Sequence, residues 1–395
     1  MVDLASRPTR ERVTAYEALR GGAALAVVFG HSFFGFGASY LGKFVPEIIL
    51  RTISNGNYAV TFFFVLSGFV LTRRYFVDRR ASYLVVGALK RWPRLALMTT
   101  IATLTSCSMR ALGLFWYQQA GALVNADGKE WLSHFGNGDG LSSSYLPDFW
   151  QAFTQGSYTT FFYGSASYDA SMWTMSIEFY GSFIAFALAY LLGRNLLLAL
   201  LISILALPFL LSWSTFSLCF VAGVLMAYSL TIAQPRWPFL VSMTLLIIGL
   251  VLPATHFAQD HFGPKGSLAA MAINIPCSLL SIAAIATSSK TEVLLSGRAA
   301  AFLGRISFPL YLIHLLVLTS LGCWLYIVVP QPYSAVVATM ATVGVSILCA
   351  ALLAPIDAAW LRALNGLVKR LLFASPRDEL ANQRQASEPV LSRSD

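Results

Sequence analysis

An apolar stretch near the start of the chain reads Leu19-Arg20-Gly21-Gly22-Ala23-Ala24-Leu25-Ala26-Val27-Val28-Phe29-Gly30-His31. With its apolar flanks it is long enough for a membrane-spanning helix, yet it contains two ionisable side chains, Arg20 and His31. Ionisable groups at membrane depth are costly, so each marks a candidate functional site. Eleven helical residues turn through roughly 1100° and rise about 16 Å, which brings both side chains to nearly one face. One helix therefore offers a cation near its start and an imidazole three turns deeper.

The composition of the whole chain is that of a membrane protein. Of its 395 residues, 57% are hydrophobic and 11% are charged, and the mean hydropathy is +0.66. Soluble domains carry about 25% charged residues. Because apolar runs of membrane length recur along the sequence, we expect an all-α, polytopic membrane bundle of about ten transmembrane helices. The predicted spans are 16–36, 58–76, 95–116, 172–192, 195–212, 215–233, 238–255, 267–287, 301–328 and 335–357.

The basic residues alternate between the connections of these spans. Of the 27 lysines and arginines, 22 fall on one side, including seven in the 73–94 connection. The positive-inside rule then places both termini in the cytoplasm. The net charge of +9 is explained by topology, so no nucleic-acid partner is expected.

The spans leave room for one domain, at residues 1–375, followed by a polar segment, 376–395, that is typical of a disordered cytoplasmic tail. The 117–171 connection is long, which is uncommon unless such a segment is functional or disordered. We expect it on the exterior side, where its aromatic residues either form an interfacial belt or stack on sugar rings. The five cysteines fall within spans, which predicts free thiols, and no metal-ligand spacing is present. The aromatic residues in question are Trp150, Phe161, Phe162 and Tyr163.

Four polar residues from four spans are predicted to lie at one depth. Counting about 1.5 Å per residue places Ser67, His31, His314 and Glu178 roughly 17, 18, 20 and 21 Å above the inner face. Each histidine could merely hydrogen-bond a neighbouring helix, and Ser67-Gly68 could be a helix-packing site. A carboxylate at this depth must be paired, protonated or in a wet cavity. The layer therefore predicts a site inside the bundle.

The motifs that contain these residues resemble the acyltransferase-3 family of membrane-bound O-acyltransferases. They follow the order of that family from the first span to the ninth. Individually several are weak, and together they are specific. The matching blocks are Arg20 and His31 with ten residues between them, Phe63-Phe64-Val65-Leu66-Ser67-Gly68-Phe69, Arg91-x-x-Arg94, Trp173-Thr174-Met175-Ser176-Ile177-Glu178, and Gly304-Arg305-Ile306-Ser307 through Leu310-Tyr311-Leu312-Ile313-His314.

Two positions depart from the family pattern. Many members carry an Asp shortly before the Phe-Phe-x-x-Ser-Gly block, where this chain has Thr61. The proline that often follows the Arg-x-x-Arg pair is replaced by Leu97, while Pro93 lies between the two arginines. The first departure leaves Glu178 as the expected carboxylate partner of His31.

The resemblance implies transfer of an acyl group, expected to be acetyl, from cytoplasmic acyl-CoA to a hydroxyl of a glycan or glycolipid at the cell inner membrane, without a metal. Near-neutral titration suits His31 as general base, and Glu178 would orient it. Arginine binds phosphate bidentately, so Arg91 and Arg94, together with Arg20, are expected to hold the CoA phosphates, although the first two could be topology markers. Further candidates are Ser67, His314 and Tyr311.

A different function class shares the same pattern. A secondary transporter or a lipid-linked glycan flippase would also have about ten spans and a polar cluster at the midplane. Transporters are often built from two related halves, and no such pairing is found in this sequence. A non-catalytic scaffold would explain the spans but not the polar layer.

Overall fold

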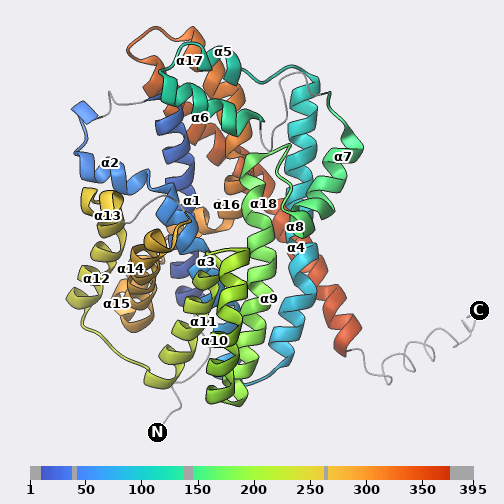
Figure 1. The fold of residues 1–395 in the computed structure, drawn as a ribbon, viewed down its shortest axis with the longest axis vertical. Coiled ribbons are helices and arrows are strands. Elements are labelled where there is room, and N and C mark those ends of the chain that lie inside the picture. Colours follow the sequence, from blue (N-terminus) through green and yellow to red (C-terminus); the bar gives the residue numbers. More distant parts are fainter. Residues whose placement is uncertain (1–9, 38–41, 138–145, 262–265, 374–395) are drawn as a thin grey trace, which may run out of the picture.

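A computed structural model describes residues 10–37, 42–137, 146–261 and 266–373 of the chain, and within these ranges it contains helices and no strands. The predicted tail, 376–395, lies outside the described residues. Figure 1 shows the arrangement of the helices. Their bounds are α1 Arg10–Phe36, α2 Glu47–Ile53, α3 Gly56–Asp78, α4 Ser82–Ala111, α5 Tyr117–Gly121, α6 Ala126–Asn137, α7 Phe149–Thr154, the π-helix η2 Gln155–Thr159, α8 Thr160–Tyr163, the 3-10 turn η3 Ala170–Met172, α9 Trp173–Arg194, α10 Leu196–Trp213, α11 Ser217–Ala233, α12 Phe239–Val251, the 3-10 turn η4 Leu252–Ala254, α13 His256–His261, α14 Leu268–Thr287, α15 Ser289–Leu294, α16 Arg298–Val317, the π-helix η5 Leu318–Gly322, α17 Cys323–Val328 and α18 Ser334–Phe373.

Each predicted span coincides with a helix of the structure. Among the described residues, seven helical segments are long and apolar enough to cross a membrane, and α11 and the α12–η4 unit are shorter apolar helices. The remaining predicted span lies in α4, which is long but rich in Thr and Ser. The structure therefore confirms an all-helical, multi-pass architecture, while the count of ten spans and the orientation of the termini stay predictions. The seven segments are Thr14–Phe36, Gly56–Asp78, Ala170–Arg194, Leu196–Trp213, Leu268–Thr287, Arg298–Val328 and Ser334–Leu371.

The centre of the bundle is built on glycine contacts between helices. A Cβ on Gly21 of α1 would lie 2.6 Å from the Leu303 backbone of α16, and a Cβ on Gly304 would lie 2.4 Å from Glu17. A Cβ on Gly68 of α3 would likewise lie 2.4 Å from the backbone oxygen of Phe220 in α11. Small residues at such crossings let helix backbones approach closely. These contacts fix α1 against α16 and α3 against α11.

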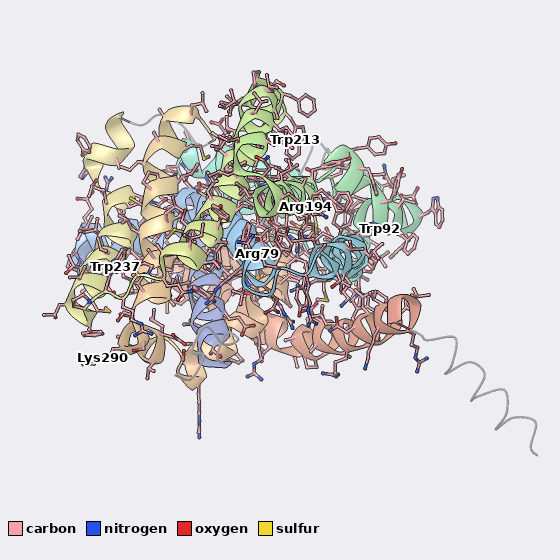
Figure 2. The ribbon with its side chains drawn as sticks, turned by 90° about the horizontal axis from the view of Figure 1, so that it is seen from below. Arg79, Trp92, Arg194, Trp213, Trp237 and Lys290 are labelled. Carbon is pink, nitrogen blue, oxygen red and sulfur yellow. The ribbon has the colours of Figure 1, made fainter. Side chains whose placement is uncertain are left out.

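Basic connections gather at the lower end of the bundle in Figure 1. Seen from below, Figure 2 labels three basic residues: Arg79 directly after α3, Arg194 at the last position of α9 and Lys290 in α15. The chain turns between α3 and α4 through Arg79, which adopts a left-handed conformation with φ 54°. If the positive-inside rule holds, this end is the cytoplasmic one.

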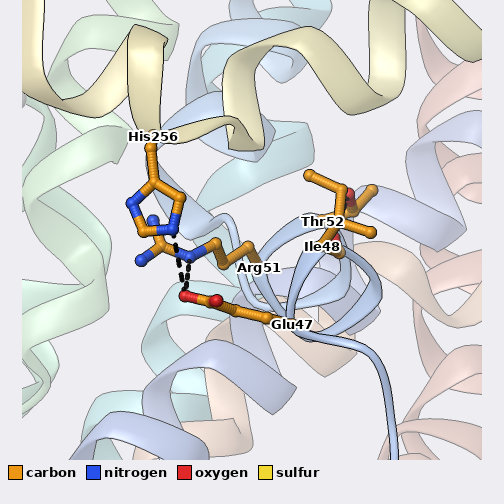
Figure 3. Close-up of polar contacts among 5 residues, drawn as sticks. All are labelled: Glu47, Ile48, Arg51, Thr52 and His256. Atoms are coloured by element: carbon orange, nitrogen blue, oxygen red, sulfur yellow. Dashed lines mark hydrogen bonds and ion pairs between the residues drawn. The ribbon is translucent and has the colours of Figure 1, made fainter.

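The upper half of the molecule carries the short helices, including α5, α6 and α17 (Figure 1). There α2 is joined to α13 by Glu47, whose Oε1 accepts from Arg51 Nε at 2.8 Å and lies 3.2 Å from His256 Nε2 (Figure 3). Arg51 holds the pKa of the Glu47 carboxyl below its usual value. Because Glu47 and His256 are solvent-exposed, their ion pair contributes little to the stability of the fold.

One part of the 117–171 connection packs along a long helix. The unit α7–η2–α8 runs alongside α4 (Figure 1), and Thr103 Oγ1 donates to Ala152 O at 2.8 Å and Thr99 Oγ1 to Gly156 O at 2.5 Å. Further down α4, Trp92 Nε1 donates to Ser157 O at 2.9 Å.

The hairpin made by residues 149–168 follows α4 over a large part of its length. Ser106 contacts the carbonyl of Tyr168 at its upper end, so the contacts extend to Trp92 over fourteen residues, or roughly 21 Å. A Cβ on Gly156 would lie 2.4 Å from Thr100 Cα, so this approach requires glycine. Threonine hydroxyls satisfy backbone groups of the hairpin, and irregular backbone is tolerated at membrane depth where protein covers it. The segment is therefore packed against α4 along its length, and its exterior location stays a prediction.

Candidate active site

The two intramembrane histidines meet where α1 crosses α16. The close approach at Gly21 and Gly304 brings the helices together, and about three turns above it His31 faces His314. His31 Nδ1 lies 2.9 Å from His314 Nε2, and the ring centroids are 5.0 Å apart. The sequence predicted both residues at one depth, and the structure brings them into direct contact.

The surroundings of the two rings differ. His314 is fully buried, and its Nδ1 lies 2.6 Å from the backbone oxygen of Tyr311. His31 is half-buried, and its ring contacts Trp131 and Phe135 of α6, with centroid distances of 5.0 and 4.6 Å. The α6 helix thus covers part of the His31 ring.

The other two members of the predicted layer form a second pair. Ser67 Oγ donates to Glu178 Oε1 at 2.8 Å, and Arg91 forms an ion pair with the same carboxylate oxygen. Gly68 packs on α11 while Ser67 points to α9, so the Ser67-Gly68 step serves both helix packing and the polar contact. Within the described residues, the hydrogen bonds of Glu178 go to Ser67 and Arg91. The structure therefore does not bring Glu178 to His31 as its expected partner.

The predicted arginines lie deeper than the sequence suggested. Arg91 is buried nine residues into α4, and Arg94 follows one turn later rather than at the helix end. Arg20 lies ten residues into α1, where its Nε donates to Ser307 Oγ at 3.1 Å. All three line one cavity, so Arg91 and Arg94 face the same space.

That cavity has a volume of about 490 Å³, and its lining reaches the exposed side chain of Arg74 at the lower end of α3. Its lining follows α3 from Val77 to Val60, seventeen residues or roughly 26 Å. Five arginines and two glutamates line it, so its net charge is positive, and the rest of the wall is largely aromatic and aliphatic. The charged lining residues are Arg20, Arg73, Arg74, Arg91, Arg94, Glu17 and Glu178.

Tyr311 and Phe63 lie in the wall at the upper end of the cavity, with ring centroids 6.0 Å apart. The Tyr311 hydroxyl accepts from Thr174 Oγ1 at 3.1 Å and donates to Ser171 O at 3.3 Å. His314 follows Tyr311 by one turn, and neither histidine is part of the cavity lining. The ring of Tyr311 thus lies between the upper end of the charged cavity and His314.

Sequence reasoning counted Arg73 and Arg74 only as topology charges. In the structure both line the lower part of the cavity, and Arg73 lies over the rings of Tyr16 and Phe69. The signal was available, because Arg74 follows Ser67 by seven residues and so lies on the same helix face. Charge alone does not distinguish a topology marker from a binding residue.

The aromatic residues of the 149–168 hairpin are either buried or exposed. Phe161 is fully buried and packs against Phe179, so it cannot stack on a sugar ring. Trp150 and Tyr163 remain exposed, at 71% and 74%. In the described part of the chain, no group of three His, Cys, Asp or Glu residues is placed to hold a metal ion.

Comparison with known proteins defines the family. A family model described as an acyltransferase domain matches residues 13–351, which is most of the chain and includes the polar residues described above. No curated protein and no solved structure matches the chain. The chain therefore belongs to the acyltransferase-3 family of membrane acyltransferases.

Proposed function

We propose that this protein transfers an acetyl group from cytoplasmic acetyl-CoA to a hydroxyl of a glycan or glycolipid at the cell inner membrane. The observation that carries the proposal is a cavity lined by five arginines that ends one helical turn below a hydrogen-bonded histidine pair. Acyltransferase family membership supports the reaction class. The acyl group, the acceptor and the role of each residue are parts of the proposal.

The charge of the cavity suits a polyanionic donor. Arg73 and Arg74, near its lower opening, would receive the CoA phosphates, since the guanidinium fork matches phosphate oxygens. From Arg74 to Phe63, α3 rises eleven residues, or about 16 Å. The pantetheine arm is about as long as four extended residues, roughly 14 Å. Phosphates at this opening would therefore place the thioester near Phe63 and Tyr311.

The deeper arginines would act along the path of the arm. Arg20 and Arg94 line the middle of the cavity, and both can donate to the amide oxygens of pantetheine or to a phosphate that enters further. Arg91 is already paired with Glu178, which compensates a charge that would be costly at this depth. In this account Glu178 acts by holding Arg91 and Ser67 in place rather than by touching His31.

The reaction follows from the position of His31 above the thioester. The acceptor hydroxyl gives its proton to His31, and its oxygen forms a bond to the thioester carbonyl carbon. The carbon–sulfur bond then breaks, and the CoA sulfur leaves with the proton that His31 received. The products are an O-acetyl ester and free CoA, and the histidine returns to its starting state.

The proposal is tested with acetyl-CoA carrying a radiolabelled acetyl group and purified protein added to membranes from a strain that lacks it. Label is expected in glycan or glycolipid, with equimolar release of free CoA. Label that crosses a sealed vesicle while still attached to CoA would instead support the transporter reading.

A binding measurement tests the donor site separately. Arg73→Ala combined with Arg74→Ala is expected to weaken CoA binding at least tenfold and to reduce its dependence on salt. Arg194→Ala is the matched control, because Arg194 belongs to the same basic end but lies outside the cavity lining. Equal affinity in the double variant and the control would contradict the assignment of the opening.

A further inference from the structure

We propose that His314 is the positioning residue that sets the proton on His31, in the place where acyl-transfer triads use a carboxylate. This inference rests on the proposed function, because it explains how His31 is held ready as a base. It starts from two distances, 2.6 Å from His314 Nδ1 to Tyr311 O and 2.9 Å from His314 Nε2 to His31 Nδ1.

The first step assigns the proton on His314. A backbone carbonyl oxygen can only accept a hydrogen bond, so His314 Nδ1 must carry a hydrogen to bond Tyr311 O. The ring is fully buried, and burial without a paired counter-charge disfavours the imidazolium form. A neutral ring holds one N–H, which is the one on Nδ1. Nε2 of His314 is therefore an acceptor.

The second step assigns the proton on His31. Because His314 Nε2 accepts, His31 Nδ1 must be the donor of the 2.9 Å bond. In neutral His31 the Nε2 atom then carries the lone pair, which is the form that a general base needs. When His31 takes the acceptor proton, its Nδ1–H bond to His314 becomes charge-assisted and strengthens. The backbone carbonyl of Tyr311 thus fixes the tautomers of both rings.

The alternative carboxylate partners are occupied elsewhere. At the position where many family members have Asp, Thr61 is buried and its hydroxyl donates to Asn57 O of its own helix at 3.2 Å. Glu178 is engaged by Ser67 and Arg91. Among the described residues, the structure gives Nδ1 of His31 a hydrogen bond to His314. A histidine at this place avoids a charged carboxylate in the middle of the bundle.

The experiment uses full-length protein in lipid nanodiscs with ¹⁵N-labelled histidine. The chain has five histidines, so the His31 signals can be assigned from their loss in His31→Asn. Solid-state NMR is expected to show His31 protonated at Nδ1 and unprotonated at Nε2. His314→Gln, whose amide oxygen can accept the same bond, should keep this tautomer, and His314→Phe should lose it.

Activity gives the second readout. His314→Phe is expected to lower kcat about 100-fold or more while the KM for acetyl-CoA stays unchanged. His314→Gln should keep most of the wild-type kcat. A wild-type His31 protonated at Nε2, or a His314→Phe protein that keeps both tautomer and rate, would overturn the inference. The NMR readout needs no turnover. A failure of acetyl transfer with the expected tautomer would therefore count against the proposed function alone.

Discussion

Buried and half-buried charged residues in this protein differ in what compensates their charge. Arg91 and Glu178 form an ion pair, and Arg20 donates a hydrogen bond to Ser307. Asp169, immediately before the η3–α9 segment, accepts from Ser171 N through Oδ1 at 2.9 Å, and within the described residues its buried Oδ2 has no hydrogen-bond partner. Burial raises the pKa of this carboxyl to about 7. Asp169 therefore carries its proton in mildly acid solution.

This state of Asp169 predicts a pH-dependent stability. Its folded pKa of about 7 exceeds the unfolded value of 3.8, so its ionisation favours the unfolded state. The resulting loss of folding stability is absent below pH 4, grows between pH 4 and 7, and reaches on the order of 4 kcal/mol above pH 7. Thermal unfolding of Asp169→Asn in detergent should lose this dependence and show a higher Tm at pH 8. Glu47 is exposed, so Glu47→Gln is the control and should keep the pH dependence of the wild type. Parallel curves of Tm against pH for wild type and Asp169→Asn would contradict the raised pKa of Asp169.

Tyr311 is the residue whose removal should join the cavity to the histidine pair. Its ring lies in the cavity wall, and two hydrogen bonds hold its hydroxyl. Tyr311→Ala is expected to admit water to the bound thioester and raise acetyl-CoA hydrolysis several-fold in the absence of acceptor. Tyr311→Phe keeps the ring and should hydrolyse near the wild-type rate. Release of free CoA measures both, and an unchanged rate in Tyr311→Ala would show that the ring is no barrier.

Among the elements, α6 contributes two aromatic contacts to His31. Trp131 and Phe135 contact the imidazole from this helix. We therefore expect α6 to border the path by which an acceptor reaches His31. A deletion within 130–145 should therefore alter acceptor choice. Residues 130–137 of that range are part of α6, and 138–145 lie outside the described residues.

The position of α6 predicts a separation of acceptor and donor effects. Trp131→Ala should change the KM for acceptor, measured as label incorporated into membrane glycan, by at least several-fold while acetyl-CoA binding stays constant. Trp150→Ala is the matched control, since this tryptophan is 71% exposed on α7 and does not contact His31. If both variants behave like wild type, α6 does not border the acceptor path.

How far the sequence predicts these elements depends on the range of the interactions that form them. Membrane-length apolar runs are local, so every predicted span became a helix. Depth counting placed Ser67, Glu178, His31 and His314 in one layer, but it did not predict which of them pair. The rotation of α4 is set by its neighbours, so the engagement of Glu178 by Arg91 was not predicted. The hairpin of 149–168 depends on threonine contacts to backbone groups about fifty residues away, which no local pattern reveals.

At the scale of the whole molecule, the bundle separates two chemical environments. The lining of a positively charged cavity reaches the end that carries the basic connections, and the histidine pair lies beyond Tyr311, in contact with α6. Positive-inside topology would place the cavity opening in the cytoplasm, where acyl-CoA is found. Donor and acceptor would then approach His31 from opposite ends of the bundle.

The most direct measurement compares His31→Ala with His256→Ala in acetyl transfer and in CoA binding. His256 lies on α13 with an exposed ion pair to Glu47, away from the cavity lining. We predict that His31→Ala binds CoA like wild type and transfers acetyl at least 100-fold more slowly, while His256→Ala does both normally. A His31→Ala protein that folds, binds CoA and transfers acetyl at the wild-type rate would contradict the account.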